Sequence, residues 1–150
     1  MEYPEIPILL VEDSPQDVLI IQRSLKKKGI QNPLHVVVDG QLAVDFLRER
    51  AVPVGVLILD IHLPKINGMA VLKAAKEIDP EIVAIMLTGR ASVETAVESL
   101  RREGAFDYLE KSKDDLPQLI EAVRSAIQKK GLSLQRHWTL RSGEDECLID

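Results

Sequence analysis

Four short, largely apolar runs in this chain each end in a residue whose side chain can act on a phosphate group. Continuous apolar runs of this length are typical of strands buried on both faces of a parallel sheet. The runs are residues 8–11, 56–59, 82–87 and 106–110, and the residues that follow them are Glu12 and Asp13, Asp60, Thr88 and Lys111. The carboxyl ends of parallel strands meet at one edge of a sheet, where open α/β folds place their ligands. The pattern therefore predicts a functional site at that edge.

Strand-like and helix-like segments alternate along most of the chain. We expect strands at 6–11, 34–38, 55–60, 82–88 and 105–109. The segments between them carry apolar residues with a helical period. The clearest stripes are Val93, Ala96, Val97 and Leu100 in the fourth helix, and Leu116, Leu119, Ile120, Val123 and Ile127 in the fifth. Such βα alternation with short connections predicts right-handed crossovers and an α/β fold with a doubly wound parallel sheet.

Capping residues predict where several helices begin and end. Ser14 can cap the first helix, with Pro15 in its first turn, and Ser92 can cap the fourth. Basic residues next to a glycine are typical of helix carboxyl ends, and they occur at Lys28-Gly29, at Arg102 near Gly104 and at Lys130-Gly131. The regular pattern stops after Gly131. We therefore expect one domain over residues 1–131, followed by a tail or the start of a linker over residues 132–150.

The composition excludes several classes of protein. The net charge of −5 and pI near 5.3 argue against direct binding to nucleic acid, since the short basic runs are explained by helix ends. The single Cys147 cannot form an internal disulfide and has no neighbours at metal-ligand spacing. The first apolar run is too short for a signal peptide or a membrane span. A cytoplasmic protein without a membrane partner is expected.

Three carboxylates are expected to share one crevice. Glu12 and Asp13 follow the first strand and Asp60 ends the third, and these two strands are neighbours in a doubly wound sheet of this kind. Carboxylates held together repel one another unless a cation lies between them, and a hard oxygen set at an open site suits Mg²⁺. Each acid also has an ordinary structural interpretation: Asp13 can help to cap the first helix, and Asp60 can begin a solvent-facing turn.

Thr88 and Lys111 add a hydroxyl and an ammonium group at the ends of the fourth and fifth strands. Gly89 follows Thr88 and leaves the backbone open to close approach. The sequence contains no Walker loop, no G-x-G-x-x-G motif and no H-E-x-x-H motif. The residues present can accept a phosphoryl group on Asp60, with a divalent cation and Lys111 neutralising charge on the transferred oxygens.

With these motifs in place, the chain resembles the receiver domain of two-component response regulators over roughly residues 6–129. The matching segments are ILLVEDS, VLILDIHLPKINGMAVL, IMLTG and GAFDYLEK. The resemblance implies a flavodoxin-like (βα)5 fold with strand order 2-1-3-4-5. It also implies a phosphoprotein of a phosphorelay that carries an aspartyl phosphate.

The resemblance assigns a role to each site residue. Asp60 would be the phosphoacceptor, and Glu12, Asp13, Asp60 and the backbone carbonyl of His62 would hold Mg²⁺. The phosphoryl group would contact Thr88, Gly89 and Lys111. Thr88 and Tyr108 would form the switch, in which the ring moves inward as the threonine shifts. Pro64 and Gly68 would shape the loop that follows the phosphoacceptor.

The sequence departs from the family pattern after Lys111, where a proline that is often cis is usual and Ser112 stands instead. A cis bond before a non-proline residue costs about 2.5–4 kcal/mol, so the turn geometry at Lys111-Ser112 does not follow from the resemblance. His62 and Arg90 lie two residues after Asp60 and Thr88, at positions that vary in the family. Each can reach the phosphoryl group or stay an exposed loop side chain.

The function expected from this resemblance is signalling. A histidine kinase or phosphotransferase would donate the phosphoryl group, and the altered surface would bind an output protein or act on an output domain missing from this chain. Such a receiver is not an enzyme, apart from its own phosphorylation and dephosphorylation. Two alternatives stay open: a metal-dependent phosphohydrolase with an Asp nucleophile, and a pseudo-receiver that binds a partner without phosphorylation.

Overall fold

A computed structural model describes residues 3–88, 104–110 and 116–149 of the chain and shows a parallel sheet of five strands in the order β2-β1-β3-β4-β5. The strands are β1 (Ile8–Val11), β2 (Leu34–Val37), β3 (Val56–Asp60), β4 (Val83–Thr88) and β5 (Asp107–Glu110). Each lies within or next to a predicted apolar run. The predicted fold class and strand order are therefore confirmed.

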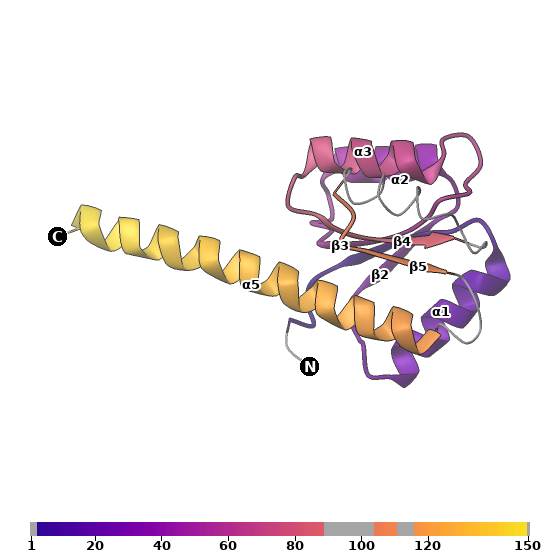
Figure 1. The fold of residues 1–150 in the computed structure, drawn as a ribbon. Coiled ribbons are helices and arrows are strands. Elements are labelled where there is room, and N and C mark those ends of the chain that lie inside the picture. The colour runs from indigo at the N-terminus through magenta and orange to yellow at the C-terminus, as the bar shows by residue number, and fades with distance from the viewer. Residues whose placement is uncertain (1–2, 89–103, 111–115, 150) are drawn as a thin grey trace.

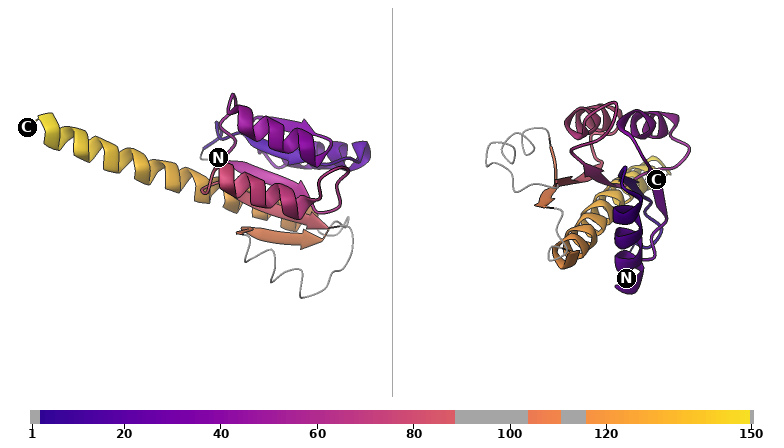
Figure 2. Two further views of the ribbon diagram at one scale, coloured as in Figure 1. Left: turned by 90° about the horizontal axis from the view of Figure 1, so that it is seen from above. Right: turned by 90° about the vertical axis from the view of Figure 1, so that its right-hand side faces the viewer.

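Helices cover both faces of the sheet (Figure 1). The described helices are α1 (Pro15–Lys27), α2 (Gly40–Glu49), α3 (Gly68–Ile78) and α5 (Leu116–Ile149). In the figure, α2 and α3 lie side by side above the sheet, and α1 and α5 lie below it. The right-hand view in Figure 2 shows the same layers. The fourth predicted helix, with its stripe over residues 93–100 and its cap at Ser92, lies outside the described residues.

The core consists of two apolar clusters, one on each face of the sheet. Alternate residues of each strand belong to different clusters, because successive side chains of a strand point to opposite faces. Leu10 and Ile58 pack with α1 and α5, whereas Leu9 and Leu57 pack with α2 and α3. All residues of β1 and β3 are buried, as expected for central strands covered on both sides.

Side-chain caps fix the beginnings of three helices. Ser14 Oγ accepts a hydrogen bond from Asp17 N at 3.3 Å, with Pro15 in the first helical position, as predicted. Asp39 Oδ1 accepts from Leu42 N at 2.8 Å, and Asn67 Oδ1 accepts from Ala70 N at 3.0 Å. Each cap satisfies an amide that has no partner within its helix. Of these helices, α2 begins shortly after β2, and α3 begins after the loop that follows Asp60.

The Asp39 cap gives the protein a pH-dependent contribution to stability. The hydrogen bond from Leu42 N lowers the pKa of the Asp39 carboxyl, partial burial opposes this, and the Lys65 ammonium at 3.4 Å lowers it further. A lowered folded-state pKa stabilises the protein above the ordinary aspartate value of about 3.9, and that stabilisation is lost as the pH falls through the folded-state pKa.

We therefore expect the difference in melting temperature between the wild type and Asp39→Asn to shrink as the pH is lowered from 7 to about 3. Thermal unfolding followed by circular dichroism checks this. Lys65→Ala is the control and should keep most of the pH dependence, because the Leu42 amide has the larger effect on Asp39. An unchanged difference across the range would contradict the assignment.

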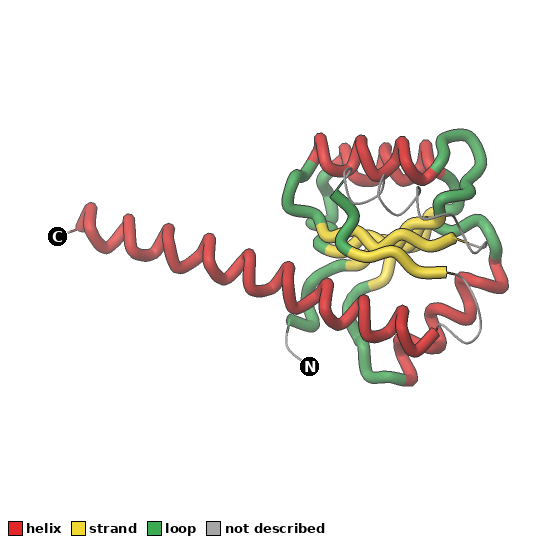
Figure 3. Tube along the Cα trace, in the orientation of Figure 1, coloured by secondary structure: helices red, strands yellow, loops and turns green. Residues whose placement is uncertain are grey.

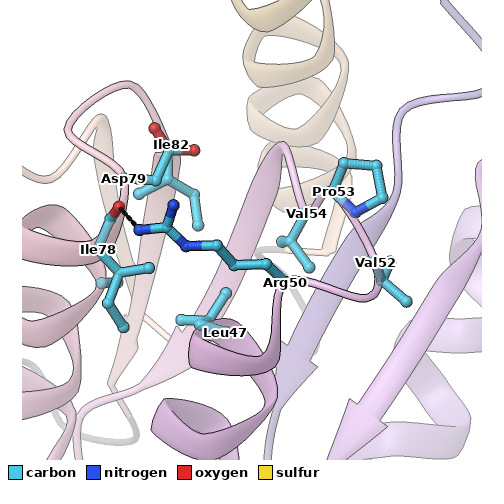
Figure 4. Close-up of a pocket in the computed structure, with 9 residues that line it drawn as sticks. Leu47, Arg50, Val52, Pro53, Val54, Ile78, Asp79 and Ile82 are labelled. Atoms are coloured by element: carbon cyan, nitrogen blue, oxygen red, sulfur yellow. Dashed lines mark hydrogen bonds between the residues drawn. The ribbon is translucent and has the colours of Figure 1, made fainter.

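Arg50 joins the carboxyl ends of α2 and α3. It follows α2 with a left-handed φ of 53°, and its Nη2 donates to the Ile78 carbonyl at 3.1 Å. Figure 4 shows the guanidinium reaching across the cavity between Leu47 and Ile78. The last carbonyls of a helix lack partners within the helix, so this contact satisfies one of them and ties the two helices together.

The predicted end of the fifth helix at Gly131 is wrong, because α5 continues to Ile149. The long helix extends well beyond the sheet (Figure 3). Gly131 is needed for packing: a Cβ there would lie 2.2 Å from the Tyr3 ring. Tyr3 Oη also donates to Gln135 Oε1 at 2.9 Å, one turn further along α5.

The other two predicted glycine positions give different outcomes. Gly29 has a φ of +82° directly after the α1 cap residue Lys28, so the predicted helix end is confirmed. Gly104 has a φ of +90°, but the helix that it was predicted to end lies outside the described part of the chain.

Within that described part, no helix combines the length and the apolar character that crossing a membrane requires.

Candidate functional site

The carboxyl ends of β1 and β3 bring three acidic side chains together. The two strands pair in parallel, with Val11 opposite Leu59, so the residues that follow them meet at the same edge. One carboxylate oxygen each from Glu12, Asp13 and Asp60 lies within 4.8 Å of the other two. The structure thus places the three predicted acids in one cluster.

The acidic cluster is buried on one side and open on the other. Glu12 and Asp60 are 0% and 4% exposed, whereas Asp13 is exposed. Glu12 Oε2 accepts a hydrogen bond from Ser14 N at 3.2 Å, and Asp60 Oδ1 accepts from His62 N at 3.0 Å. These amides orient the two buried carboxylates at the start of the loops that follow their strands.

The donor set of this cluster fits a divalent cation. Three carboxylates held this close repel one another, and burial of two of them strengthens the repulsion. Oxygen ligands from carboxylates, with an open side for water or a phosphate, are the arrangement that Mg²⁺ prefers. Glu12, Asp13 and Asp60 are therefore the described residues that can hold such an ion.

Gly68 holds the loop after Asp60 against the strand. Its amide donates to the Ile61 carbonyl at 2.8 Å, and Ile61 N in turn donates to the Leu87 carbonyl of β4 at 2.9 Å. A Cβ at Gly68 would lie 2.3 Å from the Asp60 carbonyl oxygen and 2.6 Å from Ile61 Cα. Only glycine allows α3 to begin this close to the carboxyl end of β3.

Sequence reasoning missed a second support for this loop at the start of α2. A Cβ at Gly40 would lie 2.2 Å from the Ile66 carbonyl oxygen, and Gly40 N donates to the Pro64 carbonyl at 3.5 Å. Lys65 forms an ion pair with Asp39 at 3.4 Å. The Asp39-Gly40 pair after the predicted strand at 34–38 was the available signal, but such a pair predicts a turn and does not predict that the loop after Asp60 packs on it.

The remaining predicted site residues are only partly described. Thr88 ends β4 beside the Asp60 strand, since Leu87 is the register partner of Asp60. The Thr88 side chain lies outside the described part of the structure, as do all atoms of Gly89, Arg90, Lys111 and Ser112. Their roles stay predictions.

The structure describes the side chains of two other predicted site residues, Tyr108 on β5 and His62 in the loop after Asp60. Tyr108 is half-buried on β5 and packs against the core cluster on the α2–α3 face of the sheet. The His62 side chain is exposed in the loop after Asp60, which agrees with its interpretation as a loop side chain. The switch role of Tyr108 stays a prediction.

Comparison with known proteins places this arrangement in a family. The profile of the response regulator receiver domain matches residues 8–124. The transcriptional regulatory protein ZraR of Escherichia coli O157:H7 is 35% identical over 114 residues, which cover 76% of this chain and 25% of that protein. The C4-dicarboxylate transport transcriptional regulatory protein DctD of Pseudomonas aeruginosa is 31% identical over 134 residues, which cover 89% of this chain and 28% of DctD.

A solved structure extends the similarity to the fold. The Mn(2+)-bound form of the response regulator Rcp1 is 31% identical with a TM-score of 0.70, and the match covers 80% of this chain and 92% of that one. The chain spans about a quarter of the length of the two regulatory proteins named above. The matched residues include all five described strands and the acidic cluster, and the chain therefore belongs to the response regulator receiver domain family.

Proposed function

We propose that this receiver accepts a phosphoryl group on Asp60, in a reaction that depends on Mg²⁺, and that the modification switches a protein-binding surface. The observation that carries the proposal is the cluster of Glu12, Asp13 and Asp60 at adjacent strand ends. The group donor is a histidine kinase or a phosphotransferase. The chain itself is a phosphoacceptor whose activity is limited to its own phosphorylation and dephosphorylation.

In the transfer step, a carboxylate oxygen of Asp60 forms a bond to phosphorus while the bond from phosphorus to the donor nitrogen breaks. The electron pair of that broken bond leaves with the donor imidazole, which takes a proton from solvent. His62 N stays on Asp60 Oδ1 and keeps the carboxylate oriented during attack. Bound Mg²⁺ would supply positive charge beside the transferred oxygens, held by Glu12, Asp13, Asp60 and the carbonyl of His62.

Residues at the ends of β4 and β5 complete the proposed site. The Lys111 ammonium neutralises a phosphoryl oxygen, while the Thr88 hydroxyl and the backbone at Gly89 donate hydrogen bonds to others. Thr88 and Tyr108 form the switch, because a threonine drawn toward the phosphoryl group leaves space for the aromatic ring. The position of Thr88 at the end of β4 and of Tyr108 on the neighbouring β5 supports this assignment.

The partners and the location are proposed by analogy with members of the family. ZraR and DctD are named as transcriptional regulatory proteins, and the receiver accounts for only part of each. We propose that this receiver likewise acts through an output domain or a separate output protein in the cytoplasm. The Mn(2+)-bound Rcp1 structure supports divalent cation binding by a receiver of this family.

Metal binding gives a direct test of the site. At a Mg²⁺ concentration about ten times its dissociation constant, binding should add about 1.4 kcal/mol to the free energy of unfolding. For a chain of this size that raises the melting temperature by roughly 3–6 °C. Beryllofluoride, which imitates a phosphoryl group on a carboxylate, should add a further increase when Mg²⁺ is present.

The variant Asp13→Asn should lose the Mg²⁺ effect, because the exposed acid of the cluster is neutralised without disturbing the core. Asp45→Asn is the matched control, since Asp45 is an exposed acid on α2 outside the cluster. A melting temperature indifferent to Mg²⁺ and beryllofluoride would contradict the proposal and favour a pseudo-receiver. Sustained turnover of a phosphate ester would favour the phosphohydrolase.

A further inference from the structure

A basic cavity lies at the opposite edge of the sheet from the acidic cluster. It has a volume of about 380 Å³ and lies where β4 begins and just before β5, between the end of α3 and the middle of α5. Its cationic lining residues are Lys76, Lys129 and Arg136. About two helical turns of α5 and the segment before β4 thus enclose a space with a concentration of positive charge that the acidic chain as a whole does not have.

Among the described residues, the Asp79 carboxylate, which pairs with Lys130, also acts on Lys76 but forms no ion pair with it. Among those residues, no ion pair joins Lys76, Lys129 or Arg136 to an acid. The Lys76 ammonium donates to the Ile82 carbonyl at 2.6 Å, and Lys129 Nζ lies 5.0 Å from the centre of the Phe106 ring. Both contacts orient a cation without cancelling its charge.

The surrounding backbone places Lys76 in this cavity. Gly104 has a φ of +90°, and a Cβ there would lie 3.1 Å from Lys76 Cε. Burial lowers the pKa of Lys76, and the charges on Lys129 and Lys130 lower it further, whereas the Asp79 carboxylate raises it. A half-buried ammonium next to a second one is costly unless an anion offsets it.

We propose that this cavity binds a small phosphate-bearing anion between α3 and α5. The guanidinium of Arg136 presents a planar fork that suits two phosphate oxygens, and the two ammonium groups act as further counter-charges. Ser133 lies on the same stretch of α5 and adds a hydroxyl donor, while Phe106 offers an aromatic wall. The volume is in the range of small-molecule sites, which favours a ligand of nucleotide size or smaller.

Glu81 also lines the cavity and sets a limit on the ligand. Its carboxylate disfavours a second anionic group on that side of the cavity, so the phosphate is expected near α5. This site is independent of phosphorylation at Asp60, because the cavity and the acidic cluster lie at opposite ends of the strands.

The test is a titration of the full chain with inorganic pyrophosphate in the presence of EDTA, followed by amide chemical shifts and by calorimetry. We expect saturable amide shifts at residues 81–83, 104–106 and 129–136, with residues 8–13 and 56–62 unmoved. The affinity for pyrophosphate should fall about tenfold or more in the double variant that carries Lys129→Ala and Arg136→Ala, because charge-assisted hydrogen bonds are lost. Both side chains are exposed, and the melting temperature verifies that the double variant is folded.

Lys73→Ala is the matched control, because Lys73 is an exposed lysine of α3 outside the cavity. The affinity of this variant for pyrophosphate should stay within about twofold of the wild-type value. A parallel titration with adenosine diphosphate distinguishes two ligand sources. If adenosine diphosphate binds more tightly than pyrophosphate, the ligand is a nucleotide whose base contacts the Phe106 ring. If the two bind equally, the cavity recognises the phosphate groups alone. No saturable binding, or equal affinity of the double variant and the wild type, would overturn the proposal.

Discussion

Asp60→Asn is expected to abolish the uptake of a phosphoryl group from acetyl phosphate in the presence of Mg²⁺. The amide that replaces the carboxylate is neither anionic nor nucleophilic, so no bond to phosphorus can form. The substitution preserves the shape of the side chain, and the amide oxygen can still accept the hydrogen bond from His62 N. The intact mass of the protein after incubation checks this, with one added phosphoryl group expected in the wild type alone.

Two further observations make that result specific. The added group in the wild type should survive acid and be lost in base, as an acyl phosphate is. Asp45→Asn should gain it at the wild-type rate, because Asp45 lies on the surface of α2. A phosphoryl group on the Asp60→Asn variant would show that another residue is the acceptor.

Gly68→Ala is expected to cost about 1–3 kcal/mol of stability, with a fall in melting temperature of roughly 3–10 °C. The new methyl group would meet the Asp60 carbonyl and Ile61 Cα, and these are backbone atoms that cannot rotate away. The loop must therefore shift, and Asp60 shifts with it. We also expect slower phosphorylation by acetyl phosphate, because attack requires an oriented carboxylate.

Gly29→Ala is the control for this substitution. Nothing lies within 4 Å of a Cβ at Gly29, so the variant suffers only from its φ of +82°, at a cost of about 1 kcal/mol. Its rate of phosphorylation should equal that of the wild type. If Gly68→Ala melts and reacts as the wild type does, the close approach of α3 to Asp60 is not a constraint on the site.

Most of the sheet and the acidic cluster could be predicted from the sequence because both depend on short-range pattern. Buried parallel strands read as continuous apolar runs, and the residue after each run must lie at the carboxyl edge of the sheet. This is why Glu12, Asp13 and Asp60 are adjacent in the structure although Asp60 lies far from the other two in sequence.

The features that escaped prediction depend on contacts between distant segments. Gly131 resembles a helix end, but the Tyr3 ring packs on it and α5 continues. Gly40 resembles a turn residue, yet it admits the loop that follows Asp60. The basic cavity combines residues of α3, the start of β4 and α5, and no local pattern joins these segments.

The measurement that tests the central claim most directly is to locate the phosphoryl group on the chain. Borohydride reduction of the acetyl phosphate-treated protein converts an aspartyl phosphate into the side-chain alcohol homoserine, and peptide mass spectrometry identifies its position. The proposed function requires homoserine at position 60, in the presence of Mg²⁺ only. A reduced residue at Asp13 or elsewhere, or no reduced residue at all, would contradict it.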